Sequence, residues 1–113
     1  MVTDHKAFAK EVDARAANLF KAAPDAMRAF RGLMESAGKD GALDSKTKEL
    51  MALAVVIAVH CEGCINYHTR EAIRKGASRE EVAETAAVAI EMGGGPAAVY
   101  SAQALDAFDQ LSS

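Results

Sequence analysis

The amino-acid sequence predicts an all-α protein, and three of its features indicate this class. Alanine and leucine, which favour helix over strand, make up much of the 50% of residues that are hydrophobic, while only 5% are aromatic. No segment shows the sustained alternation of apolar and polar residues that is typical of strands. Residues that cap or end helices recur along the chain. We therefore expect about six helices with short connections, in a single domain spanning residues 1–113.

The first two helices are predicted from the residues at their ends. Thr3 or Asp4 can cap a helix that runs to about Ala22. Pro24 suits the first turn of a second helix, because a proline there gives up no intrahelical hydrogen bond. This second helix carries apolar side chains at spacings of three and four residues, and it is expected to stop near the glycines of SAGKDG.

A third helix is expected to begin after a cap at Asp44 or Ser45 and to run to about His60. Between Leu50 and Val59 it is apolar on all sides, which in a water-soluble protein means burial all round. So small a chain can hardly enclose one helix completely, and we expect a neighbouring subunit to cover part of it. This apolar run is well short of the ~20 residues that would span a membrane, so no membrane association is expected.

Three more helices complete the expected order. The fourth follows the segment CEGC, where Gly63 is the expected position of a break in the chain. A capping box at Ser78 to Glu81 opens the fifth helix. The glycines at 93–95 end that helix, and a sixth is expected to run from Pro96 to Leu111.

Composition excludes several classes of function. The formal net charge is −3, and the lysines and arginines are scattered rather than clustered, so no nucleic-acid partner is expected. The N-terminal segment carries charges of both signs and lacks the apolar core of a secretory signal, so we expect a cytoplasmic protein. Two cysteines in a reducing compartment are more often catalytic or metal-binding than a structural disulfide.

Those two cysteines belong to a possible reactive group that also includes a histidine. On one helix, Cys64 and His68 lie one turn apart on the same face, and Cys61 shares that face. A cysteine pair spaced in this way can close to a disulfide with only local adjustment. If the pair opens the fourth helix, the helix dipole and free N–H groups would lower a cysteine pKa from ~8.5 towards neutral. His68 could accept or return a proton near neutral pH.

A fourth member of this group, Glu49, depends on how the chain turns. Along one unbroken helix Glu49 would lie ~18 Å from Cys61, with no contact possible. If the chain reverses near Gly63, however, Glu49 and His68 face each other on opposed helices, and two extended side chains with one water could join them. A proton relay between Glu49 and His68 therefore requires a break at the CxxC segment.

Several other interpretations stay open. The cysteines could be buried, inert thiols. Cys61, Cys64 and His68 could bind structural zinc, although the chain offers no second CxxC or HxxxH group to complete a tetrahedron. His68 could be a partly buried histidine with its hydrogen bonds satisfied, and Glu49 a first-turn carboxylate favoured by the helix dipole. Tyr67 is expected to pack or to form a pocket wall rather than to donate a proton.

The pattern E-x11-C-x2-C-x3-H formed by these residues resembles the motif of the alkylhydroperoxidase D-like group in the carboxymuconolactone decarboxylase superfamily. The flanking segments GALDSKTKELMALAV, REAIRKGASREEVAET and EMGGGPAAVYSAQAL are similar to that group as well. The resemblance covers roughly Pro24 to Leu105. It implies an all-helical fold that assembles into homotrimers or homohexamers, in agreement with the apolar third helix.

The resemblance also implies a thiol peroxidase or disulfide oxidoreductase. In such a cycle one thiolate attacks a hydroperoxide and becomes a sulfenic acid, the other cysteine resolves it to a disulfide, and an external dithiol or protein reductant restores the pair. Matched to the motif, Glu49 and His68 form the proton relay, Cys64 attacks the peroxide and Cys61 resolves. No metal or organic cofactor is required.

This sequence departs from the family pattern at one position. The best-known members carry a histidine immediately before the second cysteine, where this chain has Gly63, preceded by Glu62. One proton-handling group is thus missing, and the Glu62 carboxylate would disfavour a thiolate. Our second hypothesis is a carboxymuconolactone decarboxylase-like enzyme of aromatic catabolism, a branch that does not depend on the cysteine pair. The third is a non-enzymatic redox-sensing or zinc-binding module.

Overall fold

The computed structural model of the protein describes residues 3–113, and in that range it contains five α-helices and no strand. The all-α prediction is therefore confirmed. The helices are α1 (His5–Ala22), α2 (Pro24–Gly38), α3 (Ser45–Ala58), α4 (Glu62–Arg74) and α5 (Arg79–Leu111). Within residues 3–113, no helix combines the length and the apolar character that crossing a membrane would demand.

The count is five rather than six because the last two predicted helices form one element, α5, with a kink. Gly94 has φ 71° and ψ −150°, a backbone conformation that is essentially restricted to glycine. The predicted interruption at 93–95 is thus present. The helix resumes directly through Pro96, so no separate connection lies between the two halves.

The predicted helix starts are confirmed by their caps. The Asp4 side chain accepts a hydrogen bond from the backbone N–H of Ala7, and Asp44 accepts one from Thr47. At the start of α5, Ser78 and Glu81 bond reciprocally as a capping box. These bonds satisfy backbone donors that the first turn of a helix leaves unpaired.

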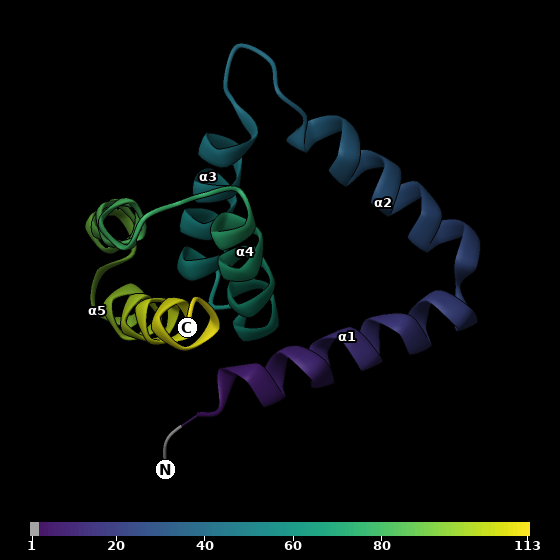
Figure 1. Ribbon diagram of the computed structural model, residues 1–113, viewed down its shortest axis with the longest axis horizontal. Coiled ribbons are helices and arrows are strands. Elements are labelled where there is room, and N and C mark those ends of the chain that lie inside the picture. Colours follow the sequence, from purple (N-terminus) through teal and green to yellow (C-terminus); the bar gives the residue numbers. More distant parts are fainter. Residues whose placement is uncertain (1–2) are drawn as a thin grey trace.

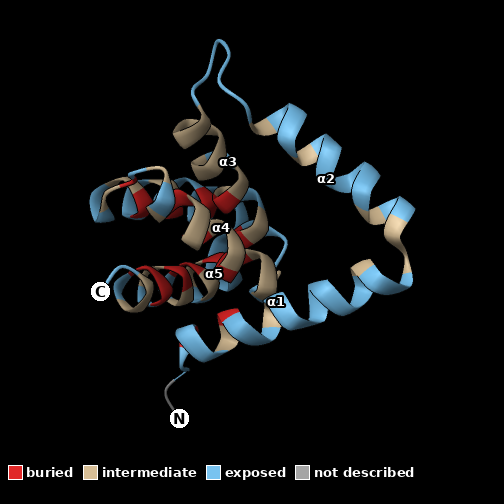
Figure 2. Cartoon of the chain, turned by 45° about the vertical axis from the view of Figure 1, so that its right-hand side comes forward, coloured by how far each residue is buried: buried red, intermediate tan, exposed pale blue. Residues whose placement is uncertain are grey.

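Helices α3, α4 and α5 form the body of the protein and enclose its core. Figure 1 shows α3 and α4 side by side, with the two halves of α5 against them. In Figure 2 the buried residues concentrate in these three helices. The largest fully buried apolar side chains there are Leu53, Ile57, Ile65 and Val82.

Helices α1 and α2 form an arm that extends away from the body (Figure 1). Only the first half of α1 is anchored, with His5 and Ala9 buried. Along the whole of α2, residues 24–38, no residue is buried (Figure 2). The arm is therefore held to the body mainly through the first half of α1.

Helix α3 is only partly covered by the rest of the chain. Leu53 and Ile57 are fully buried, but Met51, Val55 and Val59 are 51%, 60% and 65% exposed. These three residues are spaced four apart and therefore share one face of the helix. The expectation that a neighbouring subunit covers part of α3 stays a prediction, and this is the face that it concerns.

Candidate redox site

The chain reverses between α3 and α4 at His60, and the prediction that the break falls at Gly63 is wrong. Gly63 lies in the first turn of α4, whereas His60 has a left-handed backbone with φ 62°. A Cβ atom at Gly63 would only touch Val12 Cγ2 at 3.7 Å, an ordinary contact. Position 63 therefore has no need of glycine, and the glycine misled the sequence-based assignment.

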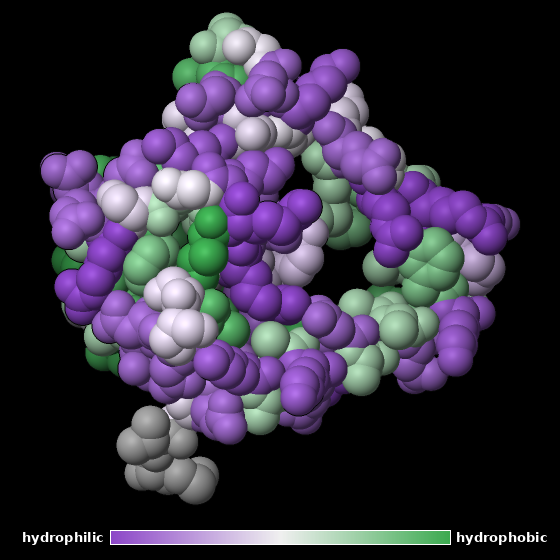
Figure 3. Space-filling view, in the orientation of Figure 1, coloured by the Kyte–Doolittle hydropathy of each residue, from purple (hydrophilic) through white to green (hydrophobic). Residues whose placement is uncertain are grey.

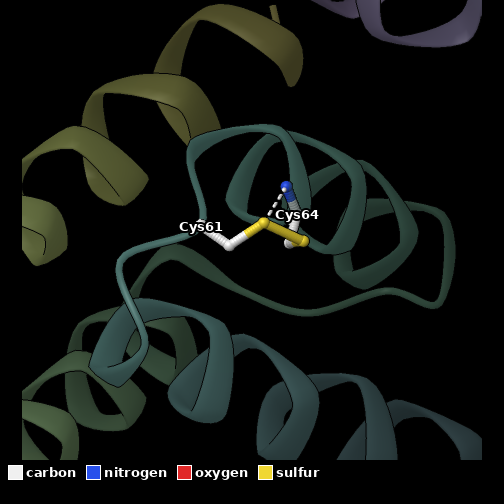
Figure 4. The surroundings of a disulfide bond; sticks show 2 residues. All are labelled: Cys61 and Cys64. Atoms are coloured by element: carbon white, nitrogen blue, oxygen red, sulfur yellow. Dashed lines mark hydrogen bonds between the residues drawn. A yellow bond between two sulfur atoms is a disulfide. The ribbon is translucent and has the colours of Figure 1, made fainter. Parts of the chain in front are cut away.

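The two cysteines meet at the N-terminus of α4, which fulfils the condition set above for a lowered cysteine pKa. Cys61 is the N-cap residue, and its Sγ atom accepts a hydrogen bond from the Cys64 backbone N–H at 3.3 Å (Figure 4). The two sulfurs are joined in a disulfide, with the Cα atoms 5.2 Å apart. Both residues are only partly buried, so a reagent in solution can reach the pair.

Glu49 and His68 contact each other directly across the α3–α4 pair. The carboxylate oxygen Oε1 of Glu49 lies 2.7 Å from Nδ1 of His68, so no bridging water is needed where one was expected. Glu49 lies beyond the first turn of α3, so the helix-dipole interpretation of this residue does not apply. The two side chains are 17% and 20% exposed, which shields their bond from bulk water.

The hydrogen bond fixes the histidine ring. A carboxylate can only accept, so Nδ1 of His68 carries the hydrogen and donates it to Glu49. The second ring nitrogen, Nε2, then remains available to hold or release a proton. This arrangement of a carboxylate behind a histidine orients the ring.

Tyr67 lies beside the Glu49–His68 pair, and all three residues line one cavity. Its ring meets the His68 ring edge to face, with the centroids 5.1 Å apart, and the Arg70 guanidinium lies 5.7 Å from its centroid. Burial raises the pKa of Tyr67, and the negative charges of Glu71 and Glu49 add to the effect. The phenol therefore stays neutral at physiological pH.

A cavity of about 970 Å³ separates the arm from the body, and the four predicted residues all line it. Figure 3 shows this hollow between the two parts of the molecule. The body contributes the disulfide and the Glu49–His68 pair. The arm contributes an apolar wall, formed by Phe20, Met27, Phe30 and Met34.

Sequence reasoning missed the arm's contribution to the site. The apolar spacing on α2 does not by itself point to the cysteines, which lie about thirty residues away along the chain. The spacing of Met27, Phe30 and Met34 was the available signal, because three such residues on one face need a partner surface. Among residues 3–113, no three His, Cys, Asp and Glu side chains converge as ligands for a metal ion.

The sequence is similar to a known protein family and to individual known proteins. Residues 24–107 match the model of the carboxymuconolactone decarboxylase family. An uncharacterized protein from Cupriavidus necator is 44% identical over 112 residues, which covers 99% of both chains.

Two solved structures are similar in fold. The apo form of a carboxymuconolactone decarboxylase family protein from Legionella pneumophila superposes with a TM-score of 0.93 and 42% identity, covering 96% of this chain and 97% of that one. A family member from Thermotoga maritima, described as a candidate for a role in an antioxidative response, has a TM-score of 0.70 and 33% identity, with 74% and 72% of the chains covered. From its sequence and its fold, the chain belongs to the carboxymuconolactone decarboxylase family.

Proposed function

We propose that the protein is an antioxidant thiol peroxidase that reduces hydroperoxides through a dithiol–disulfide cycle of Cys61 and Cys64. The observation that carries this proposal is that two groups line the same cavity. One is a disulfide at a helix N-terminus, and the other is a histidine held by a carboxylate. The family membership and the description of the Thermotoga maritima relative support the same assignment.

The first half of the cycle oxidises Cys64. Its thiolate attacks one oxygen of the hydroperoxide, the O–O bond breaks, and the sulfur loses two electrons to become a sulfenic acid. The leaving alkoxide takes up a proton and departs as an alcohol. His68 is suited to supply that proton from Nε2, while Glu49 holds the ring in place through Nδ1. We assign the attack to Cys64 because it lies one helical turn from His68.

The second half closes and reopens the disulfide. The Cys61 thiolate attacks the sulfenic sulfur of Cys64, forms the S–S bond, and releases the hydroxyl group as water after protonation. Cys61 is suited to this role because the Cys64 N–H and the N-terminus of α4 stabilise negative charge on its sulfur. An external dithiol or protein reductant then returns two electrons and two protons.

The cavity favours hydroperoxides that carry an organic group. Its volume of about 970 Å³ far exceeds what hydrogen peroxide would fill, and the four apolar side chains of the arm can contact a hydrocarbon body. Transfer of such a body from water to an apolar wall is favourable by about 0.8 kcal/mol per buried methylene group. We therefore expect organic hydroperoxides to react faster than hydrogen peroxide.

The same proposal includes a homo-oligomer, a trimer or a hexamer, working in the cytoplasm. The exposed face of α3, formed by Met51, Val55 and Val59, is apolar, and α5 exposes Val88 and Met92. Burial of such surfaces between subunits is the ordinary source of stability in small oligomeric chains. Light scattering at micromolar concentration tests this part, and a stable monomer would contradict it.

Thiol counting under metal-free conditions tests the cycle. The reduced protein is treated with one equivalent of cumene hydroperoxide, and free thiols are counted before and after. We expect the native chain to lose both thiols and to release one equivalent of alcohol. Cys64→Ser should keep its remaining thiol, whereas Cys61→Ser should form a sulfenic acid that a dimedone probe captures. Retention of both thiols in the native chain would refute the proposal.

Family membership also favours a second candidate, a carboxymuconolactone decarboxylase-like enzyme of aromatic catabolism. That chemistry does not use the cysteine pair, so a chain with both Cys61→Ser and Cys64→Ser would keep full decarboxylase activity. A non-enzymatic redox sensor, the third candidate, would form the disulfide without consuming more than one equivalent of peroxide in the presence of excess dithiol.

A further inference from the structure

The end of α3 has an unusual residue at its turning point. The N–H of Cys61 donates to the carbonyl of Val56, and the N–H of His60 donates to the carbonyl of Ile57. This pair of bonds is the Schellman arrangement, in which the residue after the helix adopts a left-handed backbone. Glycine is the usual residue there because it has no Cβ to clash. Here the position holds His60, the only non-glycine residue with positive φ among residues 3–113.

The His60 side chain has a specific partner. Its ring stacks on the ring of Tyr100, with the centroids 4.7 Å apart and the planes within 4° of parallel. Tyr100 lies on α5 beyond the kink and packs against the hydrophobic core. The stack therefore ties the turn between α3 and α4 to a third helix. A glycine at position 60 would suit the backbone better but could not make this contact.

Cys61 follows His60 in the sequence, and it takes part both in the end of α3 and in the start of α4. Its backbone N–H completes the Schellman turn of α3, and its Sγ atom faces the first turn of α4 as the N-cap. The position of the sulfur therefore depends on the geometry of the turn. In the oxidised protein the S–S bond also holds Cys61, but in the reduced protein that covalent restraint is absent.

We propose that His60, stacked on Tyr100, is a positioning residue that keeps Cys61 ready to form the disulfide with Cys64. The inference rests on the proposed function in that the pair is taken to cycle between dithiol and disulfide. Without the stack the reduced turn gains conformational freedom, whereas the disulfide still restrains the oxidised turn. Loss of the stack therefore stabilises the dithiol relative to the disulfide, because the oxidised form must give up the added freedom.

The equilibrium with glutathione measures this difference directly. In the exchange, one protein dithiol and one oxidised glutathione give one protein disulfide and two reduced glutathione molecules, so electrons and protons balance. A purely structural role would change the stability of the oxidised and reduced proteins equally and would leave this equilibrium constant unmoved. A positioning role must change it.

Four substitutions distinguish the effect of the stacked rings from the effect of the left-handed backbone on this equilibrium constant. His60→Gly keeps the left-handed turn and removes the ring, and Tyr100→Leu removes the partner ring. We expect each to lower the equilibrium constant for disulfide formation about fivefold, the size of one aromatic pair. This corresponds to a reduction potential less negative by about 20 mV. His60→Phe and Tyr100→Phe keep two stacked rings and should stay within about twofold of the native constant.

The result that overturns the proposal is a constant within twofold of the native value in both His60→Gly and Tyr100→Leu. Tyr100 also contributes to packing, so His60→Gly decides the question if Tyr100→Leu does not fold. The measurement uses no peroxide. A chain that fails to consume hydroperoxide but shows the expected shift would refute the proposed function and leave the role of His60 standing. The reverse outcome would refute only the role of His60.

Discussion

The body and the arm of this protein are both helical, yet they are held in place by different means. The body, α3 to α5, is held by burial, with Leu53, Ile57, Ile65 and Val82 almost inaccessible to water. The arm, α1 and α2, has a side-chain cap at Asp4 and an ion pair within each helix but buries very little. Local sequence signals thus mark where each helix begins and ends, whereas its position in space depends on burial.

The candidate site uses both regions in different ways. The reactive groups, Cys61, Cys64 and the Glu49–His68 pair, all come from the body, where packing fixes their geometry. The arm supplies only the apolar wall, whose non-directional contacts do not require accurately placed side chains. Reactive side chains must be held accurately to act together, so their location on the better-packed elements is the expected arrangement.

Two leucine substitutions, one in the body and one in the arm, should differ most in their effect on the free energy of unfolding. Leu53→Ala in the body empties a fully buried position and should lower the free energy of unfolding by about 2–5 kcal/mol. Leu33→Ala in the arm, where the leucine is 63% exposed, should change it by no more than about 0.5 kcal/mol. Urea denaturation followed by circular dichroism measures both. Comparable losses would show that the arm is covered in the assembled protein.

The attachment of the arm can be weakened at one residue of α4. Asn66 is buried, its Nδ2 donates to the His5 carbonyl, and its Oδ1 accepts from Arg70, which also bonds Asp13 of α1. Asn66→Ala leaves the buried His5 carbonyl without this partner, at a cost of about 1–3 kcal/mol.

Hydrogen exchange locates this loss. Amides of α1 should exchange faster in Asn66→Ala, while those of α3 should keep their protection. Asn18→Ala, on an exposed part of α1, is the matched control and should leave both unchanged. Equal acceleration in α1 and α3 would mean that the arm and the body open as one unit, contrary to the contrast drawn above.

The smallest expected effect concerns acid stability within the body. The Ser78 backbone N–H and, next, the Lys46 ammonium hold the pKa of Glu81 below its usual value of 4.5. A carboxyl whose pKa is lower in the folded chain than in the unfolded chain stabilises the fold when the pH is above the unfolded-state pKa. This contribution is lost as the pH falls through the folded-state pKa.

The gap between the native chain and Glu81→Gln measures this contribution. The native chain should be the more stable at about pH 6, and the difference should shrink at about pH 3, as the Glu81 carboxyl takes up a proton and becomes neutral like glutamine. Denaturant unfolding at the two pH values provides the comparison. A gap of the same size at both would show that the charge of Glu81 is irrelevant to the cap.

Much of the fold was predictable because its signals are local. Asp4, Asp44 and Ser78 cap helices where the sequence indicated, since a capping side chain needs only the next few backbone groups. The glycines at 93–95 likewise mark the kink. The count is five rather than about six because Gly94 kinks the chain without requiring a loop, a distinction that depends on what packs on either side.

The candidate site was predictable only in part, for a related reason. The spacing of Cys61, Cys64 and His68 fixes a shared helix face, and the opposed position of Glu49 follows once the chain reverses. The reversal itself was misplaced, because histidine is not a turn residue by propensity. The contact that compensates for its left-handed backbone, the Tyr100 ring, lies forty residues away and cannot be inferred from local sequence.

The kink at Gly94 interrupts the helical backbone between the two halves of α5. Before it, Val88 and Met92 are exposed on the surface proposed for subunit contact, and after it, Tyr100 supports the turn beside Cys61. In one continuous helix, inserting a residue would swing every later side chain by about 100°. A non-helical residue between the halves can absorb such a change in its own backbone angles, so the surface before Gly94 can vary without moving the residues that support Cys61.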